Sequence, residues 1–600
     1  MPTAEPPSTA GGDRSRRWAW AGLAIVLAAG LGLRLWGVGQ GLPFAYNTDE
    51  ADHFVTHAVK MFATGSLNPR YFANPPAFTY LLHVLFAISY GGASGVVHTF
   101  AAHPAELYTL ARVAAALLGT GALWLLYATG ARLLGRGVGL LAAAIEAVAF
   151  LPVFYAHLAL NDVPTLAPLT LSLLGSAGVL RRDRLRDYLI AGIGLGLACA
   201  TKYTAGIAIV PFAAAVAARY LEGGRSSGRD ALVGLVVAGT AALAAFLIAN
   251  PYAILDFHSF QGELAHQSSL SAEAQGKLGA PKVGGLPYYL WALTWGLGWV
   301  PTLAALGGAI AVWRVDRPVG WMLVPAPLLF LAFMGLQGRY FGRWLLPIFP
   351  LLCLLAAFFA LWVADAGARL LSGRRAADAG SAAAGAGSDV SVGPGARAAL
   401  TGLVVAAMLA QGLVYSIHSG LVLSRPDTRS LALRWMLGHI PAGASIVVEP
   451  IAPNAWVAGI PGAPACPGHR WCKYPSLYSR ISPDGSLRRV SAVPVGIEDY
   501  ERTLSPALID YYQSHGFCWV VSGSTQADRA FADPAAVPLA IAYYGALARR
   551  GTVVYRASPY GEGQGPVPFN FDWSFDYYPL AYHRPGPTVT IYRLKGGGCR

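Results

Sequence analysis

The residues best suited to chemistry lie in the segment Tyr46-Asn-Thr-Asp-Glu-Ala-Asp-His53, which follows the first long apolar run. A carboxylate held at an apolar boundary beside a second carboxylate can have a raised pKa, which suits a general base that takes a proton from a hydroxyl. We predict Asp49 as this base and Glu50 as a second catalytic acid. The alternative is a solvated loop whose acids cap the following helix, with Asp52 and His53 pairing locally.

Further ionisable residues interrupt the apolar pattern on the same predicted side of a membrane. Asp162 follows the third apolar run, and we predict it as another catalytic acid. Lys202, Arg339 and Arg343 can stabilise the negative charge that develops on a phosphate leaving group. For each of these cations the alternative is snorkelling, in which a long basic side chain reaches for lipid headgroups. Ionisable groups at the bilayer edge are costly, and they usually mark a site, a pathway or a paired charge.

Other polar residues near these positions are predicted to bind substrate. They are Asp52, His53, Asn74, Tyr80, His157, Asn161, Tyr203, Asp256 and Tyr340. Arg34 and Arg112 also lie near outer ends of apolar runs, and there we favour snorkelling. Glu146 lies within an apolar run and therefore needs an internal partner.

The composition places these residues in a membrane. A chain of 600 residues with 55% hydrophobic and 12% charged residues cannot bury its apolar surface in one aqueous core. The net charge of +13 comes from basic residues in short links between apolar runs, so we interpret it as a topology signal, not as nucleic-acid binding. No cysteine or histidine spacing indicates structural zinc. The C-terminal region holds an even group of cysteines that could pair in an oxidising compartment, namely Cys466, Cys472, Cys518 and Cys599.

About eleven apolar runs are long enough, or nearly so, to cross a core of roughly 30 Å. They are residues 18–33, 107–134, 138–155, 163–180, 188–200, 205–218, 231–249, 287–313, 319–336, 344–363 and 398–423. With the N-terminus inside, every even-numbered link is rich in arginine and cytoplasmic. Residues 76–88 are then expected to form a helix lying at the outer interface, because counting them as a span would reverse every later link. The predicted fold is a polytopic α-helical membrane protein with its C-terminus outside.

The expected domains follow from this topology. They are a cytoplasmic N-terminal tail (1–17), a transmembrane catalytic domain (18–371) with its first outer loop at about 39–106, a flexible cytoplasmic linker rich in Ala, Gly and Ser (372–397), a last span (398–423) and an extracytoplasmic α/β domain (424–600). In the last domain we expect helices at 428–440 and 505–516, and strands at 445–449, 519–522, 553–556 and 588–594.

The order of these residues resembles a known class of enzymes. The similarity lies in Asp49-Glu50 after the first span, Asn74-Pro75-Pro76 before an aromatic helix, Arg112 opening the second span, His157-Leu-Ala-Leu-Asn-Asp162, Thr201-Lys-Tyr-Thr204 and Arg339-Tyr340. It covers roughly residues 18–363 and points to the protein O-mannosyltransferase and aminoarabinose-transferase families of GT-C membrane glycosyltransferases.

The resemblance implies roles for several residues. The acid at Asp49 would activate the acceptor hydroxyl, Asp162 would help organise the same cavity, and the sugar would be transferred with inversion. Arg339 and Lys202 would hold the donor phosphate. Two features depart from the pattern: Asn74 stands where these families usually have His or Lys, and the C-terminal domain does not look like the β-trefoil of eukaryotic protein mannosyltransferases.

The predicted function is therefore transfer of a sugar from a polyprenyl-phosphate donor to a hydroxyl or amine of a protein, lipid or glycan acceptor at the extracytoplasmic face. No cofactor is predicted, although Asp49, Asp52 and Asp162 could together bind a divalent cation. Two other classes of protein compete with this interpretation. A lipid-linked-sugar flippase or other transporter should carry its charges at mid-depth, and a non-catalytic membrane anchor would leave the acids unexplained.

Overall fold

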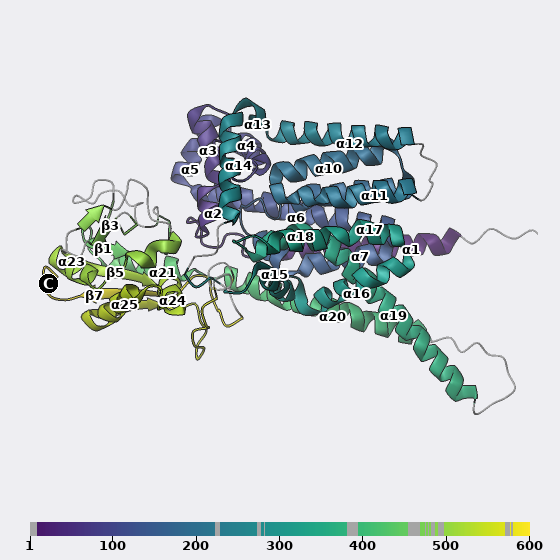
Figure 1. The fold of residues 1–600 in the computed structure, drawn as a ribbon. Helices are drawn as coiled ribbons and strands as arrows, with labels where there is room; N and C mark the ends of the chain where they lie inside the picture. Colours follow the sequence, from purple (N-terminus) through teal and green to yellow (C-terminus); the bar gives the residue numbers. More distant parts are fainter. Residues whose placement is uncertain are drawn as a thin grey trace, which may run out of the picture.

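A computed structural model describes residues 9–221, 228–272, 278–280, 282–380, 394–453, 456, 469–474, 476–477, 479–481, 487–489, 497–570, 577 and 580–599. Long helices form one bundle, and a smaller unit of strands and helices lies at one end of it (Figure 1). The bundle and its outer segments comprise α1 (Thr9–Leu35), α2 (Thr48–Asp52), α3 (Phe54–Thr64), α4 (Ala77–Tyr90), α5 (Ala93–Ala102), α6 (Pro104–Leu133), α7 (Arg136–Val148), α8 (Phe150–Tyr155), α9 (Leu166–Arg182), α10 (Leu185–Thr201), η1 (Tyr203–Ala208), α11 (Ile209–Leu221), α12 (Gly228–Ala249), α13 (Tyr252–Leu255), α14 (Phe257–Ala272), α15 (Gly285–Leu293), η2 (Thr294–Gly298), α16 (Trp299–Val315), α17 (Arg317–Leu323), α18 (Pro325–Gly335), η3 (Gly342–Ile348), α19 (Phe349–Gly380) and α20 (Pro394–Leu423).

The helices identify a multi-pass membrane protein. Within the described residues, eight helices are long and apolar enough to cross a membrane. On α12, Leu232, Val236 and Leu243 are each about three-fifths exposed (61%, 59% and 60%), as expected for side chains that face lipid. The remaining expected spans correspond to shorter helices: the pair α7 and α8, broken at Ala149, and α9 and α10 of 17 residues each. A helix of about 17 residues is at the lower limit for a bilayer span.

α10 packs closely between α9 and α12 because it carries glycine where backbones meet. A Cβ at Gly192 would lie 2.2 Å from the carbonyl oxygen of Ala238, and one at Gly196 would lie 2.1 Å from that of Ala242. Small residues allow this approach, which stabilises helix pairs in lipid. Lys202 follows the last residue of α10, so this packing fixes the depth of its ammonium group.

The start of α1, the end of α19, the end of α11 and the start of α12 lie at the end of the bundle opposite the C-terminal unit (Figure 1). These helix ends and the C-terminal unit are thus separated by the length of the bundle. The assignment of the C-terminal end to the outer face stays a prediction.

The segment predicted as a flexible linker, 372–397, is helical at both of its ends. α19 continues to Gly380 and α20 begins at Pro394, while residues 381–393 lie outside the described part of the chain. That part of the expectation is wrong, since the alanine-rich composition of this segment also favours helix.

Residues 76–88, expected as an outer interfacial helix, form α4. Gly91 and Gly92 follow with φ of 74° and 89°, and the chain bends there by 93° into α5. Such left-handed backbone angles favour glycine. The position of α4 relative to a membrane stays a prediction.

Arg34 is fully buried, so its interpretation as a snorkelling residue is wrong. Its guanidinium donates hydrogen bonds to the main-chain oxygens of Gly30 (2.9 Å), Ala147 (3.0 Å) and Glu146 (3.2 Å). A cation at this depth needs such acceptors because no water is available. Arg34 therefore supplies the positive charge beside Glu146 for which the sequence named no partner.

The C-terminal unit is built on a five-stranded sheet with the order β2-β1-β5-β7-β6. Its elements are α21 (Thr428–His439), β1 (Ser445–Val448), β2 (Cys472–Lys473), β3 (Ser479–Ile481), β4 (Leu487–Arg489), η4 (Ile497–Thr503), α23 (Ala507–Ser514), β5 (Phe517–Gly523), α24 (Ser524–Ala532), α25 (Pro538–Arg550), β6 (Gly551–Ala557) and β7 (Val589–Leu594). β1 is parallel to β2 and β5, whereas β7 is antiparallel to β5 and β6. Each predicted strand and helix of this region overlaps one of these elements.

Both faces of the sheet are covered, because side chains alternate along each strand. On β1, Val447 belongs to one apolar core while Ile446 and Val448 belong to the other. A disulfide joins Cys518 to Cys599, and Cys472 is also disulfide-bonded. Cys466 lies outside the described residues.

Glu449, directly after β1, is a buried acid in this unit. The hydroxyl of Ser522 and the N–H of Gly523 each donate to its Oε2 at 2.8 Å. Burial nevertheless raises the pKa of Glu449 to about 7, from an ordinary value of 4.5. The folded chain therefore retains a proton that the unfolded chain releases. Stability is fully present below about pH 4.5 and is lost as the pH rises through about 7.

We expect Glu449→Gln to remove a large part of this pH dependence, because the amide keeps the shape and does not titrate. The wild-type thermal midpoint in detergent should fall relative to the variant across this window, by an amount equivalent to about 3 kcal/mol. Glu562→Gln, at an exposed site, should keep the wild-type slope. Equal slopes in the wild type and Glu449→Gln would contradict the assignment.

Candidate active site

A cavity of about 710 Å³ lies among α2, the loop before α4, η1, α14 and the segment between α18 and η3. We call it the central cavity. It collects most of the predicted site residues from distant parts of the chain, namely Asp49, His53, Asn74, Asn161, Asp162, Lys202, Tyr203, Arg339 and Arg343. Many of these lie at helix ends: Asp49 is in the first turn of α2, and Lys202 is the C-cap of α10.

The short helix α2 positions Asp49. The side chain of Asn47 caps this helix by accepting a hydrogen bond from the N–H of Glu50 at 3.1 Å. Arg343 Nη2 donates to Asp49 Oδ2 at 2.6 Å. Burial alone would raise the pKa of Asp49, but the charge of Arg343 and its hydrogen bond outweigh it and hold the pKa below its usual value. The predicted raised pKa is therefore wrong, because this arginine, 294 positions away, pairs with the carboxylate.

A second ion pair lies in the same cavity. Lys202 donates to Asp162, and both side chains are largely buried (11% and 4% exposed). The amide of Asn161 donates to the carbonyl of Thr201 at 2.6 Å, which ties the turn before α9 to the end of α10. Two carboxylates and their cationic partners thus face one enclosed space.

Tyr71 is a cavity residue that the sequence reasoning missed. Its ring stacks with those of His53 and His57, with a centroid distance of 4.8 Å to each, and its hydroxyl accepts from Asn74 Nδ2 at 2.6 Å. Burial lowers the pKa of His53 and of His57, which favours neutral rings in this stack. The available signal was the Tyr71-Phe72 pair, which only Ala73 separates from Asn74-Pro75-Pro76.

α13 and α14 hold the loop that carries Tyr71. Glu263 Oε2 accepts from the N–H groups of Phe72 (2.5 Å) and Ala73 (2.9 Å), and Asp256 Oδ2 accepts from Asn68 Nδ2 (2.7 Å). Asp256 was predicted to bind substrate, but it does not line the central cavity. It fixes the loop instead.

Glu50 faces away from the central cavity. Arg112 donates to both of its carboxylate oxygens, each at 2.7 Å, and the N–H of Ala159 donates to Oε1 at 2.7 Å. Both charged side chains are fully buried, so snorkelling of Arg112 is wrong. Neighbouring residues on a helix point about 100° apart, which separates Glu50 from Asp49. Through these contacts Glu50 holds α2 in place. A catalytic role for Glu50 stays a prediction.

Three other predicted substrate-binding residues have structural partners outside this cavity. His157 is buried between the carbonyls of Trp36 and Phe154, Tyr80 donates to the carbonyl of Leu67, and Tyr340 donates to the carbonyl of Val283. Asp52 lines a different cavity. Asp49, Asp52 and Asp162 are therefore not brought together, and among the described residues no group of three or more acids, histidines or cysteines is placed to hold a metal ion.

In sequence and in fold, this chain resembles the GT-C membrane glycosyltransferases. Residues 106–253 match the family model described as dolichyl-phosphate-mannose-protein mannosyltransferase. Lipid A galacturonosyltransferase RgtD of Rhizobium johnstonii is 28% identical over 227 residues, which make up 37% of this chain and 42% of that protein. The match thus spans less than half the length of this curated relative.

One solved structure shares the fold, and a second can be aligned over most of the chain. The oligosaccharyltransferase of Archaeoglobus fulgidus superposes with a TM-score of 0.51 at 15% identity, over 92% of this chain and 75% of that one. ArnT from Cupriavidus metallidurans has a TM-score of 0.49 at 14% identity, over 96% of this chain and 98% of that one. The relatives of this chain are thus glycosyltransferases.

Proposed function

We propose that this protein moves a sugar from a polyprenyl-phosphate donor to a hydroxyl or amine acceptor at the extracytoplasmic face of a membrane. The observation that carries the proposal is the central cavity, where the carboxylate of Asp49 pairs with Arg343 and shares the lining with the cations Arg339 and Lys202. The description of the matched family names a dolichyl-phosphate sugar as donor, which supports a lipid-linked donor here.

The proposed reaction uses Asp49 as general base. As the acceptor oxygen attacks the anomeric carbon, its proton passes to Asp49. The bond from that carbon to the phosphate oxygen breaks, and the polyprenyl phosphate leaves with the negative charge. Arg339, Arg343 and Lys202 stabilise this charge. Attack opposite the leaving group inverts the anomeric carbon.

Arg343 links donor binding to the state of the base. Without donor, its guanidinium pairs with Asp49 at 2.6 Å. A donor phosphate competes for the same guanidinium and loosens that ion pair. Loss of the pairing raises the pKa of Asp49, because a nearby positive charge favours the ionised form. The base thus becomes stronger when the donor is bound.

We expect Arg343→Met to raise the donor KM by about tenfold or more, since a charge-assisted hydrogen bond contributes about 1.5–3 kcal/mol. It should also move the acid limb of the kcat/KM profile to higher pH, because Asp49 loses the charge that lowers its pKa and must be deprotonated to act. Arg343→Lys should keep part of the donor binding. Arg502→Met, at an exposed ion pair, is the control. An unshifted acid limb in Arg343→Met would contradict the role of this pair.

The direct test is transfer of labelled sugar by the purified chain from a panel of polyprenyl-phosphate sugars to membrane acceptors. The proposal expects consumption of at least one donor with release of polyprenyl phosphate. If no donor is consumed but labelled lipid-linked sugar crosses vesicles that contain the chain, the transporter replaces the transferase. If neither occurs, the anchor interpretation replaces both.

A further inference from the structure

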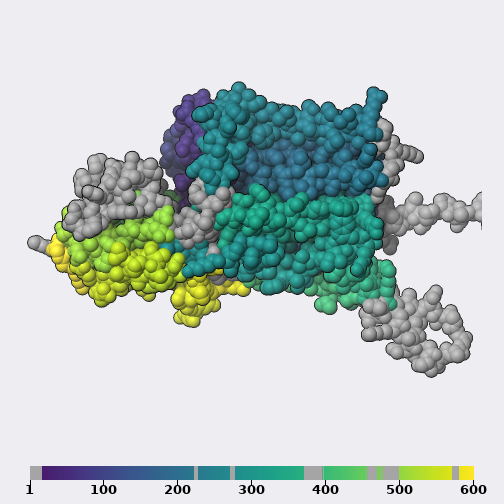
Figure 2. Space-filling model, viewed as in Figure 1, coloured from purple at the N-terminus to yellow at the C-terminus, as the bar shows by residue number. Residues whose placement is uncertain are grey.

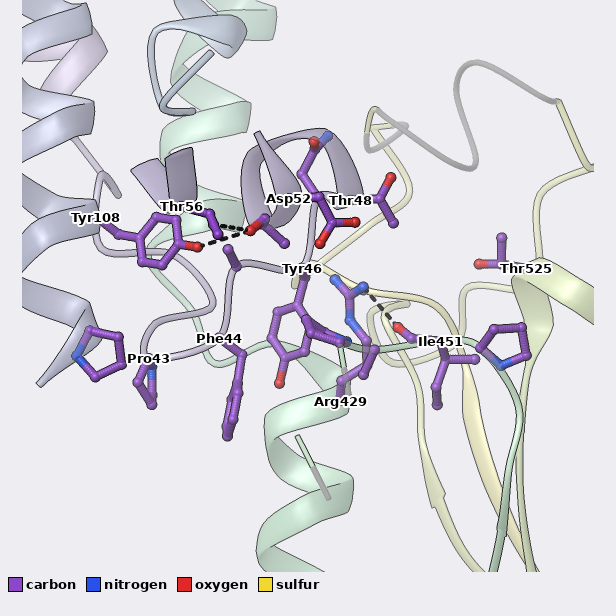
Figure 3. Close-up of a pocket in the computed structure, with 18 of the residues that line it drawn as sticks. Pro43, Phe44, Tyr46, Thr48, Asp52, Thr56, Tyr108, Arg429, Ile451 and Thr525 are labelled. Atoms are coloured by element: carbon purple, nitrogen blue, oxygen red, sulfur yellow. Dashed lines mark hydrogen bonds between the residues drawn. The ribbon is translucent and has the colours of Figure 1, made fainter. Parts of the chain in front are cut away.

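A second cavity, of about 580 Å³, lies between the first outer loop and the C-terminal unit. We call it the interdomain cavity. Figure 2 shows the C-terminal unit against one end of the bundle, and Figure 3 shows Thr48, Asp52 and Thr56 across this cavity from Ile451 and Thr525.

The helix α2 separates the two cavities. Asp49 lines the central cavity, Ala51 and Asp52 line the interdomain cavity, and Asn47 and Thr48 line both. A ligand in the interdomain cavity that reaches Asn47 and Thr48 is therefore at the edge of the space that holds the proposed base. The cations proposed for the donor phosphate, Lys202, Arg339 and Arg343, line the central cavity and not this one, so the interdomain cavity suits the acceptor.

The cavity walls are held rigidly by contacts between the two parts of the chain. Arg429 Nε and Nη2 donate to Asp427 at 2.9 and 2.8 Å, Nη1 donates to the carbonyl of Ile451 at 3.2 Å, and the guanidinium stacks 3.8 Å from the ring of Tyr46. The hydroxyl of Tyr46 bonds to Ser430 at 2.9 Å and accepts from Trp456 at 3.1 Å. The cavity is thus preformed, which lowers the cost of binding.

On the outer-loop side, the wall is fixed by the carbonyl of Ala51. The hydroxyls of Thr56 (2.6 Å) and Tyr108 (3.3 Å) both donate to it (Figure 3). Both side chains line the cavity. The end of α2 is therefore tied to α3 and α6, so Asp52 is presented from a fixed helix.

The chemistry of the walls favours a neutral polyhydroxyl ligand. Asp52 accepts hydrogen bonds, Lys473 donates them, and the hydroxyl of Thr525 can do both, as the mixed hydroxyls of a sugar require. Phe44 and Phe100 add apolar ring surface for the C–H faces of sugar rings. A phosphate group would need several uncompensated cations, yet the charge of Arg429 is neutralised by Asp427.

The same walls disfavour a peptide bound by its main chain. The C-terminal side contributes Pro450, Pro453 and Pro587 to the lining. Proline has no N–H to pair with a peptide carbonyl, so a strand of added chain would find few donors there. A volume of about 580 Å³ also lies within the range of roughly 300–1,000 Å³ that is typical of pockets for small ligands.

We infer that the interdomain cavity binds the non-reacting part of a neutral glycan acceptor and directs its terminal hydroxyl past Asn47 and Thr48 towards Asp49. This inference rests on the proposed function, and it gives the C-terminal unit the role of acceptor recognition. Thr525, in the first turn of α24, is the position at which the cavity can be filled from the C-terminal side.

The test uses the full chain in detergent, probed on an array of neutral oligosaccharides, charged oligosaccharides and short peptides. The wild type should bind at least one neutral oligosaccharide. Thr525→Trp, which fills the cavity, should weaken that binding by about tenfold or more, a loss of about 1.4 kcal/mol. Thr552→Trp places the same ring at an exposed site on β6 and should bind like the wild type.

Transfer assays separate this inference from the proposed function. Asp49→Asn should keep glycan binding and lose transfer, whereas Thr525→Trp should raise the acceptor KM and leave the donor KM unchanged. Binding of peptides or charged glycans alone, no binding at all, or an unchanged Thr525→Trp would each overturn the inference and leave the transferase proposal standing. Glycan binding without consumption of any donor would overturn the proposed function, and with it the acceptor role of the cavity.

Discussion

Replacing Asp49 by asparagine is expected to lower kcat for sugar transfer by about 10²- to 10⁴-fold, the usual contribution of a general base. The amide keeps the shape of the side chain but cannot take the acceptor proton. Since the substitution also releases Arg343 from its ion pair, the donor KM should stay the same or fall. Steady-state transfer of labelled sugar, with donor and acceptor varied separately, measures both effects.

Asp510→Asn provides the matched control, because Asp510 is a 64% exposed acid that pairs with Arg550 in the C-terminal unit. It should transfer sugar at the wild-type rate. A folded Asp49→Asn variant with wild-type kcat would show that another group takes the proton. A variant that loses donor binding instead would place Asp49 in donor recognition.

Arg112→Met is expected to lower the free energy of unfolding by about 3–5 kcal/mol, because it leaves a buried carboxylate without its cation. In the native chain Arg112 donates to both oxygens of Glu50, and both side chains are fully buried. The same guanidinium donates to the carbonyls of Val38 and Gln40, so the outer loop loses two further contacts. Thermal unfolding in detergent measures the loss.

The double variant Glu50→Gln/Arg112→Met should recover part of this stability, since the uncompensated charge is gone. Arg397→Met breaks an exposed pair with Asp365 and should leave the midpoint almost unchanged. If Arg112→Met alone unfolds at the wild-type temperature, the ion pair does not hold the outer loop.

The sequence could group the cavity residues because it predicts how deep in the membrane each residue lies and on which side. Hydropathy and the arginine bias of the links are enough for that prediction, and neither requires knowledge of packing. Asp49, Lys202 and Arg343 were grouped in this way, and they line one cavity. The direction of each side chain around its helix was not available. Glu50 directly follows Asp49, and only the packing against Arg112, 62 positions away, turns it into the core.

The partner of each charged residue also could not be predicted from the sequence, because ion pairs depend on contacts between distant segments. The pKa of Asp49 was predicted in the wrong direction for this reason, and Arg112 and Arg34 were assigned to lipid headgroups although both are fully buried. The pairing of the cysteines likewise could not be predicted from the sequence. Four cysteines allow three connectivities, and the disulfide between Cys518 and Cys599, 81 positions apart, depends on where β5 begins relative to the chain end.

The two walls of the interdomain cavity come from separate stretches of chain, residues 43–108 on one side and 429–587 on the other, whereas the central cavity is lined by residues 47–344. The reacting groups and the C-terminal wall of the interdomain cavity can therefore change independently. A chimera that exchanges residues 424–600 between two relatives would carry acceptor preference with the exchanged part and keep the donor of the recipient. In evolutionary terms, such a chain can gain new acceptors without altering the groups that break the bond.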